Sequence, residues 1–203
     1  MRRVAVFVLL VPAAFAAGCT RTSGNTAPAK PTRATPTSTT SGRTIAASGA
    51  FVAYAPGASA ITYDPTLVPV GATATVTITQ MALPTRVQLI VAGLRPNRGY
   101  GAHLHTNPCG PTGEAAGPHY QHHHDPAASA SRPSVDPSYA NPQNEVWLDF
   151  TTDGNGRASA TATHPWTFGT NARSLIIHAM TTKTAPGEAG TAGARAACLA
   201  LPA

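Results

Sequence analysis

Alternating apolar and polar residues form the most regular pattern in this chain, and they indicate β-strands. Between residues 73 and 79, threonine alternates with alanine, valine and isoleucine, which would give an extended segment one polar and one apolar face. Other short runs of β-branched or apolar residues follow, and glycine, proline and asparagine separate them. The predicted strands comprise residues 50–55, 73–79, 86–91, 98–105, 145–151, 157–163, 174–178 and 194–201.

No segment shows a sustained helical period of apolar residues, and no internal repeat is visible. Several short strands separated by turns predict an all-β domain, either a β-sandwich or a Greek-key β-barrel. Residues 107–143 interrupt this pattern with few apolar residues and many Gly, Pro, Ser and Ala. A loop of that length within a compact domain tends to carry function.

The N-terminal residues predict export and a lipid anchor. A short basic start precedes an apolar run over residues 4–17. That run is shorter than the roughly 20 residues that span a bilayer, so residues 1–18 are interpreted as a signal peptide. Small residues lead directly into Cys19, which resembles the lipobox of bacterial lipoproteins, in which the cysteine becomes the lipidated N-terminus. The alternative is an ordinary secretory signal, cleaved after Ala17 or Gly18.

Residues 19–44 are interpreted as a disordered tether that precedes a folded domain over residues 45–203. After Cys19 the tether consists mostly of Thr, Ser, Pro, Ala and Gly, which cannot bury enough apolar surface to offset the entropy of ordering. The net charge of +6 resides in the signal and tether, because the domain holds eight basic and eight acidic residues. Basic residues beside an anchor suit an anionic membrane surface, and nothing predicts nucleic-acid binding. We therefore expect the protein on the outer face of the cell membrane.

The other two cysteines, Cys109 and Cys198, form an even pair once Cys19 carries lipid. In an exported protein such a pair predicts a disulfide. The bridge would close a loop of about 90 residues, worth roughly 4–5 kcal/mol in the chain-entropy description. A reactive or metal-bound thiol at Cys109 is the alternative.

Two histidines in one predicted strand are the first candidate metal ligands. His103 and His105 are separated by Leu104, so their side chains share one face of the strand. Two imidazoles on a rigid strand form half of a metal site, and imidazole suits copper, zinc, iron and nickel. His178, at the end of the apolar strand 174–178, could supply a third imidazole from a distant part of the sequence. For the pair of histidines alone, a strand with two surface histidines is the alternative.

Taken together, several pieces of this sequence resemble the copper/zinc superoxide dismutase family. They are His-x-His at 103–105, Cys109, Gly-Pro-His-Tyr at 117–120, the strand ending in His178, and Ala-Gly-Ala-Arg-Ala-Ala-Cys at 192–198, in the same order as in the family. The resemblance covers roughly residues 76–201. It implies a Greek-key β-barrel and the copper-dependent conversion of superoxide to dioxygen and hydrogen peroxide.

The resemblance also implies roles for individual residues. The lasting copper ligands would be His103, His105 and His178. His119 would bridge copper and zinc, leave copper when the metal is reduced, and carry a proton. Cys109 and Cys198 match the family's disulfide, and Arg195 matches the arginine that attracts superoxide, since a guanidinium stays cationic at every relevant pH. Many members pair, so a homodimer is compatible with the resemblance.

The zinc half of the family's site is expected to be missing. Asn144 stands where the last zinc histidine should be, Trp147 where the zinc aspartate should be, and Ala127 near the place of the remaining zinc histidine. Residues 179–182 also lack the family's acidic residue that links the copper and zinc ligands. We therefore expect copper without zinc, as in the bacterial and fungal copper-only members. The orientation of His119 would then depend on other neighbours.

Some remaining residues are assigned to the surface or to packing. His122, His123 and His124 lie too close to His119 to match zinc ligands, and they are interpreted as a solvated cluster or a metal scavenger that could bind a metal in its own fashion. His164 is expected at the surface. Tyr120 and Trp147 are expected to pack beneath the long loop.

Three other functions fit part of the pattern. A lipoprotein that buffers or passes on copper without catalysis would use the same four histidines. A cupin-type metal enzyme also uses His-x-His, but that motif needs a glutamate soon afterwards, whereas Glu114 is farther along and Cys109 intervenes. A β-sandwich adhesion or scaffold module would hold no metal.

Overall fold

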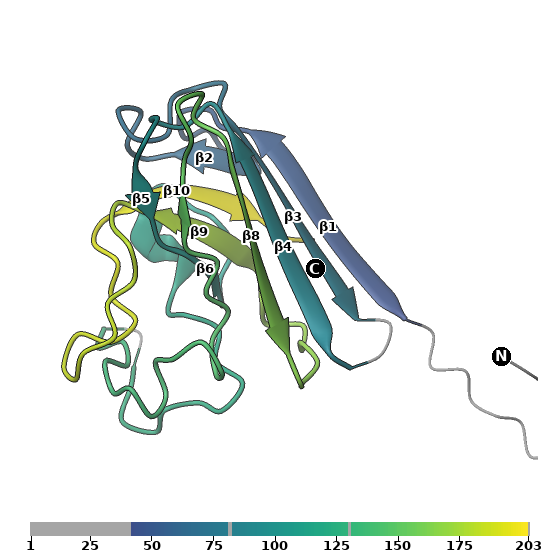
Figure 1. The fold of residues 1–203 in the computed structure, drawn as a ribbon, viewed down its shortest axis with the longest axis vertical. Coiled ribbons are helices and arrows are strands. Elements are labelled where there is room, and N and C mark those ends of the chain that lie inside the picture. The colour runs from purple at the N-terminus through teal and green to yellow at the C-terminus, as the bar shows by residue number, and fades with distance from the viewer. Residues whose placement is uncertain (1–41, 81–82, 130, 203) are drawn as a thin grey trace, which may run out of the picture. The chain divides into compact units, whose positions relative to one another are not determined.

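The computed structural model describes residues 42–80, 83–129 and 131–202, and the predicted signal peptide, Cys19 and nearly all of the tether lie outside these ranges. Ten strands and one short 3-10 helix, η1, form within the described part (Figure 1). They are β1 (Arg43–Ala50), β2 (Ala60–Thr62), β3 (Thr73–Gln80), β4 (Thr85–Ala92), β5 (Gly99–Tyr100), β6 (Ala102–His105), η1 (Gly113–Ala116), β7 (Phe150–Thr151), β8 (Ala158–His164), β9 (Ser174–His178) and β10 (Arg195–Ala200). Among the described residues, no helix has the length and apolar character that crossing a membrane requires.

Two four-stranded sheets make up most of the fold, which confirms the all-β prediction. One sheet has the order β1-β3-β4-β8 and the other β2-β10-β9-β6, while β5 and β7 pair separately. Every pairing within the sheets is antiparallel. In Figure 1 the first sheet runs down the right side, and the second crosses behind it on the left. The long connections that follow β6 and β9 gather below the second sheet (Figure 1).

The core lies between the two sheets and follows from the alternation in the sequence. Along β3, Ala74, Val76 and Ile78 are buried, whereas the threonines between them are partly or fully exposed. Strand β9 differs, because all five of its residues are buried. One side of β9 faces the common core, and Ile176 on the other side joins a small apolar cluster with Ala116 and Cys198. A strand buried on both sides has little freedom to move, which suits its position next to the site described below.

The first strand lies earlier in the chain than the pattern predicted. It is β1, Arg43–Ala50, rather than residues 50–55, and it pairs with β3 over its whole length. Its Ala-, Ser- and Gly-rich composition concealed it, because Ile45 and Ala47 are its only partly buried side chains that pack against the core. β1 therefore includes Arg43 and Thr44, which the sequence placed in the tether.

The predicted strand over residues 145–151 is mostly irregular. Only Phe150–Thr151 forms a strand, β7, and the residues before it contact β6 through an isolated bridge between His103 and Trp147. Val146 and Leu148 are nevertheless buried in the core, so the apolar alternation that predicted a strand is real. The short strand β2 was not predicted, since three residues are too few to show a pattern.

His164 is buried, so its assignment to the surface was wrong. It is the last residue of β8, with 1% of its surface exposed, and its ring lies 4.3 Å from the Trp166 ring and 5.9 Å from that of Phe168. The bend that follows at Pro165 does not carry His164 into solvent, because pairing with Thr85 keeps it in the sheet. Tyr120 packs in the same aromatic group, as expected for a residue beneath the long loop.

The predicted disulfide between Cys109 and Cys198 is confirmed. It joins the long loop to β10 across 89 positions of sequence. Cys198 is fully buried, and the bridge holds the loop segment that contains η1 against the second sheet. Such a bond indicates an oxidising compartment outside the cytoplasm.

Candidate metal centre

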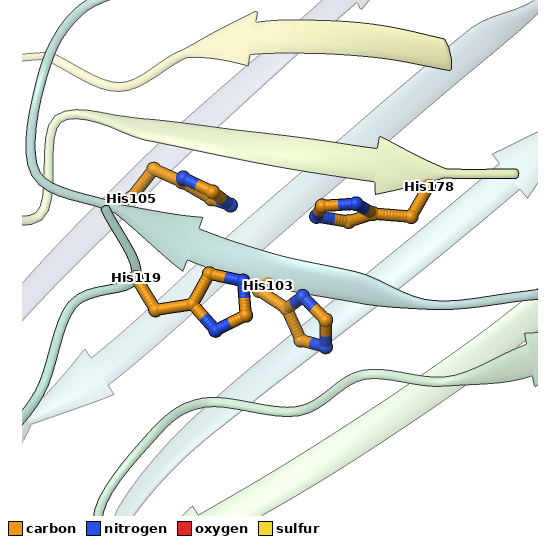
Figure 2. A group of neighbouring side chains, drawn as sticks. All are labelled: His103, His105, His119 and His178. Carbon is orange, nitrogen blue, oxygen red and sulfur yellow. The ribbon is translucent and has the colours of Figure 1, made fainter. Parts of the chain in front are cut away.

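Two neighbouring strands and one loop bring four histidines together (Figure 2). His103 and His105 belong to β6, and His178 ends the adjacent, antiparallel β9. His119 comes from the long loop, which meets β6 through an isolated bridge between His105 and His119. In Figure 2 the four rings converge on one space beside β6 and β9. We call these residues the four-histidine centre.

The rings of the four-histidine centre are close enough to share one ion. One nitrogen from each side chain lies within 4.8 Å of those of the other three. The ring centroids of His103 and His119 are 4.2 Å apart, and those of His103 and His178 are 4.8 Å apart. His103 and His105 have no exposed surface, His178 has 4%, and only His119 is partly open to solvent.

Hydrogen bonds on the outer side of each strand histidine fix which nitrogen points inward. The Nδ1 atoms of His105 and His178 lie 2.9 Å and 3.3 Å from the carbonyl oxygens of Gly117 and Gly193. Each of these nitrogens therefore carries a proton and donates it, which leaves Nε2 as an acceptor. In His103 the arrangement is reversed, and Nε2 is the nitrogen that has an outer partner.

The inward nitrogens of these three histidines are buried and have no hydrogen-bond partner in the structure. They are Nδ1 of His103, Nε2 of His105 and Nε2 of His178. Buried polar atoms are nearly always paired, so three unpartnered lone pairs in one place call for a ligand that accepts electron density. A transition-metal ion fits this donor set, since imidazole is a preferred ligand for copper and zinc.

Burial also keeps these imidazoles in the form that binds metals. Burial lowers the pKa of His103 and His105 well below the usual histidine range, and positive charge on His119 lowers it further. For His178, the same causes lower the pKa to about 3. The three rings are therefore neutral at physiological pH, and a neutral imidazole binds metal without first losing a proton.

His119 is oriented by a carboxylate that the sequence analysis did not identify. Its Nδ1 lies 2.8 Å from Oε2 of Glu145, whose side chain is almost fully buried. The same carboxylate accepts a hydrogen bond from Nε1 of Trp147 and another from Nε2 of Gln121, both at 2.8 Å. Trp147 thus does more than pack beneath the loop, because it holds the carboxylate that holds His119.

A second carboxylate supports His103 through a hydroxyl group. Nε2 of His103 lies 2.7 Å from Oγ1 of Thr182, and that hydroxyl donates to Oδ1 of Asp149 at 2.6 Å. The backbone N–H of Thr182 also donates to Asp149, at 2.7 Å. A hydroxyl that donates to the carboxylate can accept only from its other neighbour, so His103 carries its proton on Nε2 and presents Nδ1 inward.

One signal in the sequence could have revealed these supporting residues. Glu145, Trp147 and Asp149 alternate with the buried Val146 and Leu148, so the three polar side chains share one face of an extended segment. The bridge between His103 and Trp147 turns that face toward the four-histidine centre. The sequence shows the alternation, but it does not show that this segment lies against β6.

Arg195 lies at the mouth of the same site. It begins β10 beside a shift in register between Arg195 and Ala197, an irregularity that redirects a side chain near a strand end. Its Nη1 donates to the carbonyl oxygen of Gly113 in η1 at 2.9 Å. Arg195, His119 and His178 line one cavity of about 550 Å³, so a small anion entering it approaches both a guanidinium and the centre.

The residues that stand where the family has zinc ligands make hydrogen bonds within the protein. Asn144 is buried and its amide nitrogen donates to the carbonyl oxygens of His123 and Tyr139. Trp147 donates to Glu145. Within the described ranges, the four-histidine centre is the only group of three or more His, Cys, Asp or Glu side chains close enough to share a metal, and His122, His123 and His124 do not belong to it.

Comparisons with known proteins agree with this geometry. Residues 72–200, more than half of the chain, match the family described as copper/zinc superoxide dismutase (SODC). Among solved structures, the Cu/Zn superoxide dismutase from Brucella abortus is similar with a TM-score of 0.50 and 21% identity, over 79% of this chain and 99% of that one. A mutant of an SOD-like protein from Bacillus subtilis has a TM-score of 0.47 and 18% identity, over 64% of this chain and 90% of that one. Comparison with curated protein sequences gives no match.

The Brucella abortus structure supports the fold, and the match over residues 72–200 shows the family. That stretch runs from just before β3 to the end of β10, and it contains all four histidines of the centre and both cysteines of the disulfide. The chain therefore belongs to the copper/zinc superoxide dismutase family.

Proposed function

We propose that this protein is a copper-dependent superoxide dismutase that works outside the cytoplasm and lacks zinc at the family's usual position. The observation that carries the proposal is the set of three buried, unpartnered imidazole nitrogens in the four-histidine centre. His103, His105 and His178 would hold copper permanently, and Nε2 of His119 would complete its ligands. Bound copper would supply one-electron redox chemistry, oxidising one superoxide to dioxygen and reducing the next to peroxide.

The chain's own residues bring in the anion and the proton. Arg195 is a cation in the cavity that also contains His119 and His178, so it raises the local concentration of superoxide. His119 is partly open to that cavity and therefore accessible to solvent protons, as a residue that delivers a proton to peroxide must be. Nδ1 of His119 is held by Glu145, so its Nε2 is the atom left for this exchange.

The proposal of a copper-only centre rests on what occupies the neighbourhood of His119. Nδ1, the nitrogen that would meet zinc in the family's arrangement, is hydrogen-bonded to Glu145. Asn144 and Ala127 supply no imidazole or carboxylate, and the indole nitrogen of Trp147 is a donor only. Glu145 thus performs the orienting role that a zinc ion would otherwise have.

Placement at the membrane is part of the same proposal. Cys19 follows a signal-like segment, and a lipid there would hold the domain at the outer face of the membrane by way of the tether. The Cys19→Ala variant should then appear in the soluble extracellular fraction, whereas the wild-type protein stays with membranes. A homodimer remains a prediction from the resemblance alone.

Metal analysis combined with superoxide consumption tests the catalytic proposal. We expect the purified protein to hold copper but no stoichiometric zinc, and to consume superoxide faster than the same amount of free copper. Arg195→Ala should lower the rate about tenfold or more and weaken its dependence on salt, while copper content stays the same. Arg157→Ala, which removes an exposed arginine at the β7–β8 turn, is the matched control.

The alternative function is copper buffering, with the same four histidines as ligands. It predicts tight copper binding with a rate no higher than that of free copper and no effect of Arg195→Ala. That combination of results would replace the enzyme proposal with the buffering one.

A further inference from the structure

The rings of two exposed neighbouring histidines, His122 and His123, lie close together. The ring centroids of His122 and His123 are 4.2 Å apart with an interplanar angle of 57°. His103 and His119, inside the four-histidine centre, are also 4.2 Å apart, with an angle of 44°. No hydrogen bond engages the ring of His122 or His123 within the described part of the chain. Their ring nitrogens are therefore available to a ligand.

The pair is held in place by Asn144, the residue that stands where the family has a zinc histidine. The carbonyl oxygen of Asn144 accepts from the backbone N–H of His122 at 2.8 Å, and its Oδ1 accepts from that of His123 at 2.7 Å. Its Nδ2 donates to the carbonyl oxygen of His123 at 2.8 Å. Because Asn144 is buried, these three bonds fix the backbone of both histidines to the interior.

The ring of His122 is also fixed, by stacking on an indole. It lies parallel to Trp166, with centroids 4.7 Å apart and an interplanar angle of 2°. Trp166 is buried and donates from Nε1 to the carbonyl oxygen of Gln143 at 2.9 Å. Stacking covers the face of an imidazole but leaves the nitrogens at its edge free. Binding a ligand at this pair would cost little side-chain entropy, since the ring of His122 is already ordered.

A second cavity opens beside the pair. It has a volume of about 420 Å³, and its lining includes both histidines and the polar side chains of Ser138, Asn141 and Gln143. Partial desolvation lowers the pKa of His122, which favours the neutral ring that can donate a lone pair to a metal. His122 also lines the larger cavity that contains His119 and His178, and it therefore lies between the two spaces.

We propose that His122 and His123 form an auxiliary copper(II) site, separate from the four-histidine centre. Imidazole nitrogens are good ligands for divalent transition metals, and copper(II) binds a given nitrogen site more tightly than manganese, iron, cobalt, nickel or zinc. The cavity provides no carboxylate among its lining residues, so water completes the coordination. A site of two imidazoles and water binds copper more weakly and more reversibly than the four-histidine centre does.

Copper(II) titration of the untagged protein tests this site. The first equivalent is added to fill the four-histidine centre, and a second is then added while bound copper, the electron paramagnetic resonance spectrum and tryptophan fluorescence are followed. We expect the second equivalent to bind with a distinct nitrogen-ligated spectrum and to quench Trp166, which lies against His122. The double variant His122→Gln/His123→Gln should bind the second equivalent at least tenfold more weakly and retain the first.

His124→Gln is the matched control, because His124 lines only the larger cavity and should be dispensable. The auxiliary site is refuted if the wild type and the double variant alike bind one equivalent only, if the double variant retains the second equivalent, or if His124→Gln loses it. A failure of the four-histidine centre would look different, since the first equivalent would then be missing from all variants. In that case the double variant would bind none, while the wild type and His124→Gln would still bind one.

Discussion

Nδ1 of His119 and Oε2 of Glu145 lie 2.8 Å apart. The carboxylate of Glu145 also accepts hydrogen bonds from the side chains of Gln121 and Trp147. Glu145 cannot turn away without breaking its bonds to Gln121 and Trp147. The nitrogen of His119 that faces Glu145 must therefore be the donor, and the other nitrogen is free to face the remaining three rings. This single contact sets the tautomer of the loop histidine in the four-histidine centre.

Replacing Glu145 by alanine should weaken the centre without unfolding the protein. We expect Glu145→Ala to lower copper affinity and the rate of superoxide consumption by about ten- to a hundredfold, the usual effect of losing a group that orients a metal ligand. Affinity is measured by competition with a copper chelator, and the rate by superoxide decay. Trp147 and Gln121 would also lose an acceptor, so circular dichroism should be recorded to verify that the fold is retained.

Glu188→Ala is the control for that experiment. Glu188 forms an ion pair with Lys183 at 2.7 Å, with both side chains more than 40% exposed. The substitution removes a negative charge from the surface, and Glu188 contacts no histidine of the four-histidine centre. If the two variants bind copper equally well, Glu145 does not orient His119 and another group must do so.

Three residues of the four-histidine centre could be found from local sequence patterns, whereas His119 was identified only through the resemblance to the family. His-x-His places two imidazoles on one face of a strand, and an apolar run ending in His178 marks a buried neighbour. The residues that support them could not be found in the same way. Glu145 meets His119 across 26 positions, and Thr182 meets His103 across 79. Nothing local to either residue indicates its partner.

The fold shows the same division between local and distant information. Strands such as β3 and β9 were predicted because their own alternation or apolar run defines them. β1 was misplaced because its small residues carry almost no pattern, and only pairing with β3 makes it a strand. His164 was assigned to solvent for a similar reason, since the single Pro165 beside it suggested a turn and nothing local indicates the pairing with Thr85 that buries it.

Glycine at position 113 is needed to place Arg195. A Cβ atom on Gly113 would lie 2.5 Å from Cβ of Arg195 and 3.2 Å from its Cδ, so Gly113→Ala should push the arginine away and break its bond to the carbonyl oxygen of residue 113. We expect superoxide consumption to fall about tenfold at low salt, with the salt dependence reduced and copper content unchanged. The measurement is the rate of superoxide decay at two ionic strengths.

Gly154→Ala provides the matched glycine substitution, because an added Cβ there would meet nothing within 4 Å. Its rate and salt dependence should equal those of the wild type. An unchanged rate in Gly113→Ala would show that the position of Arg195 does not limit the approach of the anion.

The disulfide should contribute strongly to stability. Cys109→Ala/Cys198→Ala frees a loop of 89 positions in the unfolded chain, and the chain-entropy description gives a loss of roughly 4–5 kcal/mol in the free energy of unfolding. Urea unfolding of the oxidised wild type and the double variant measures this difference. The wild type with reductant present serves as control and should match the variant. A difference below about 1 kcal/mol would mean that the unfolded chain retains structure or that strain in the bridge cancels its effect.

The buried histidine at the end of β8 should make stability depend on pH. Burial lowers the pKa of His164, and positive charge on His122 lowers it further. Among the described residues, neither ring nitrogen of His164 has a hydrogen-bond partner. In the unfolded chain the ring takes up a proton near the usual pKa of about 6.5, whereas the folded protein resists protonation until a lower pH. The contribution is therefore complete above about pH 6.5 and decreases as the pH falls below it, because the unfolded state then binds more protons than the folded state. His164→Phe should flatten the decline of the urea midpoint between pH 7.5 and 5 in metal-free protein, and Thr163→Ala, at the exposed neighbouring position, should leave it unchanged. Parallel curves for His164→Phe and the wild type would show that protonation of this ring is not what weakens the fold in acid.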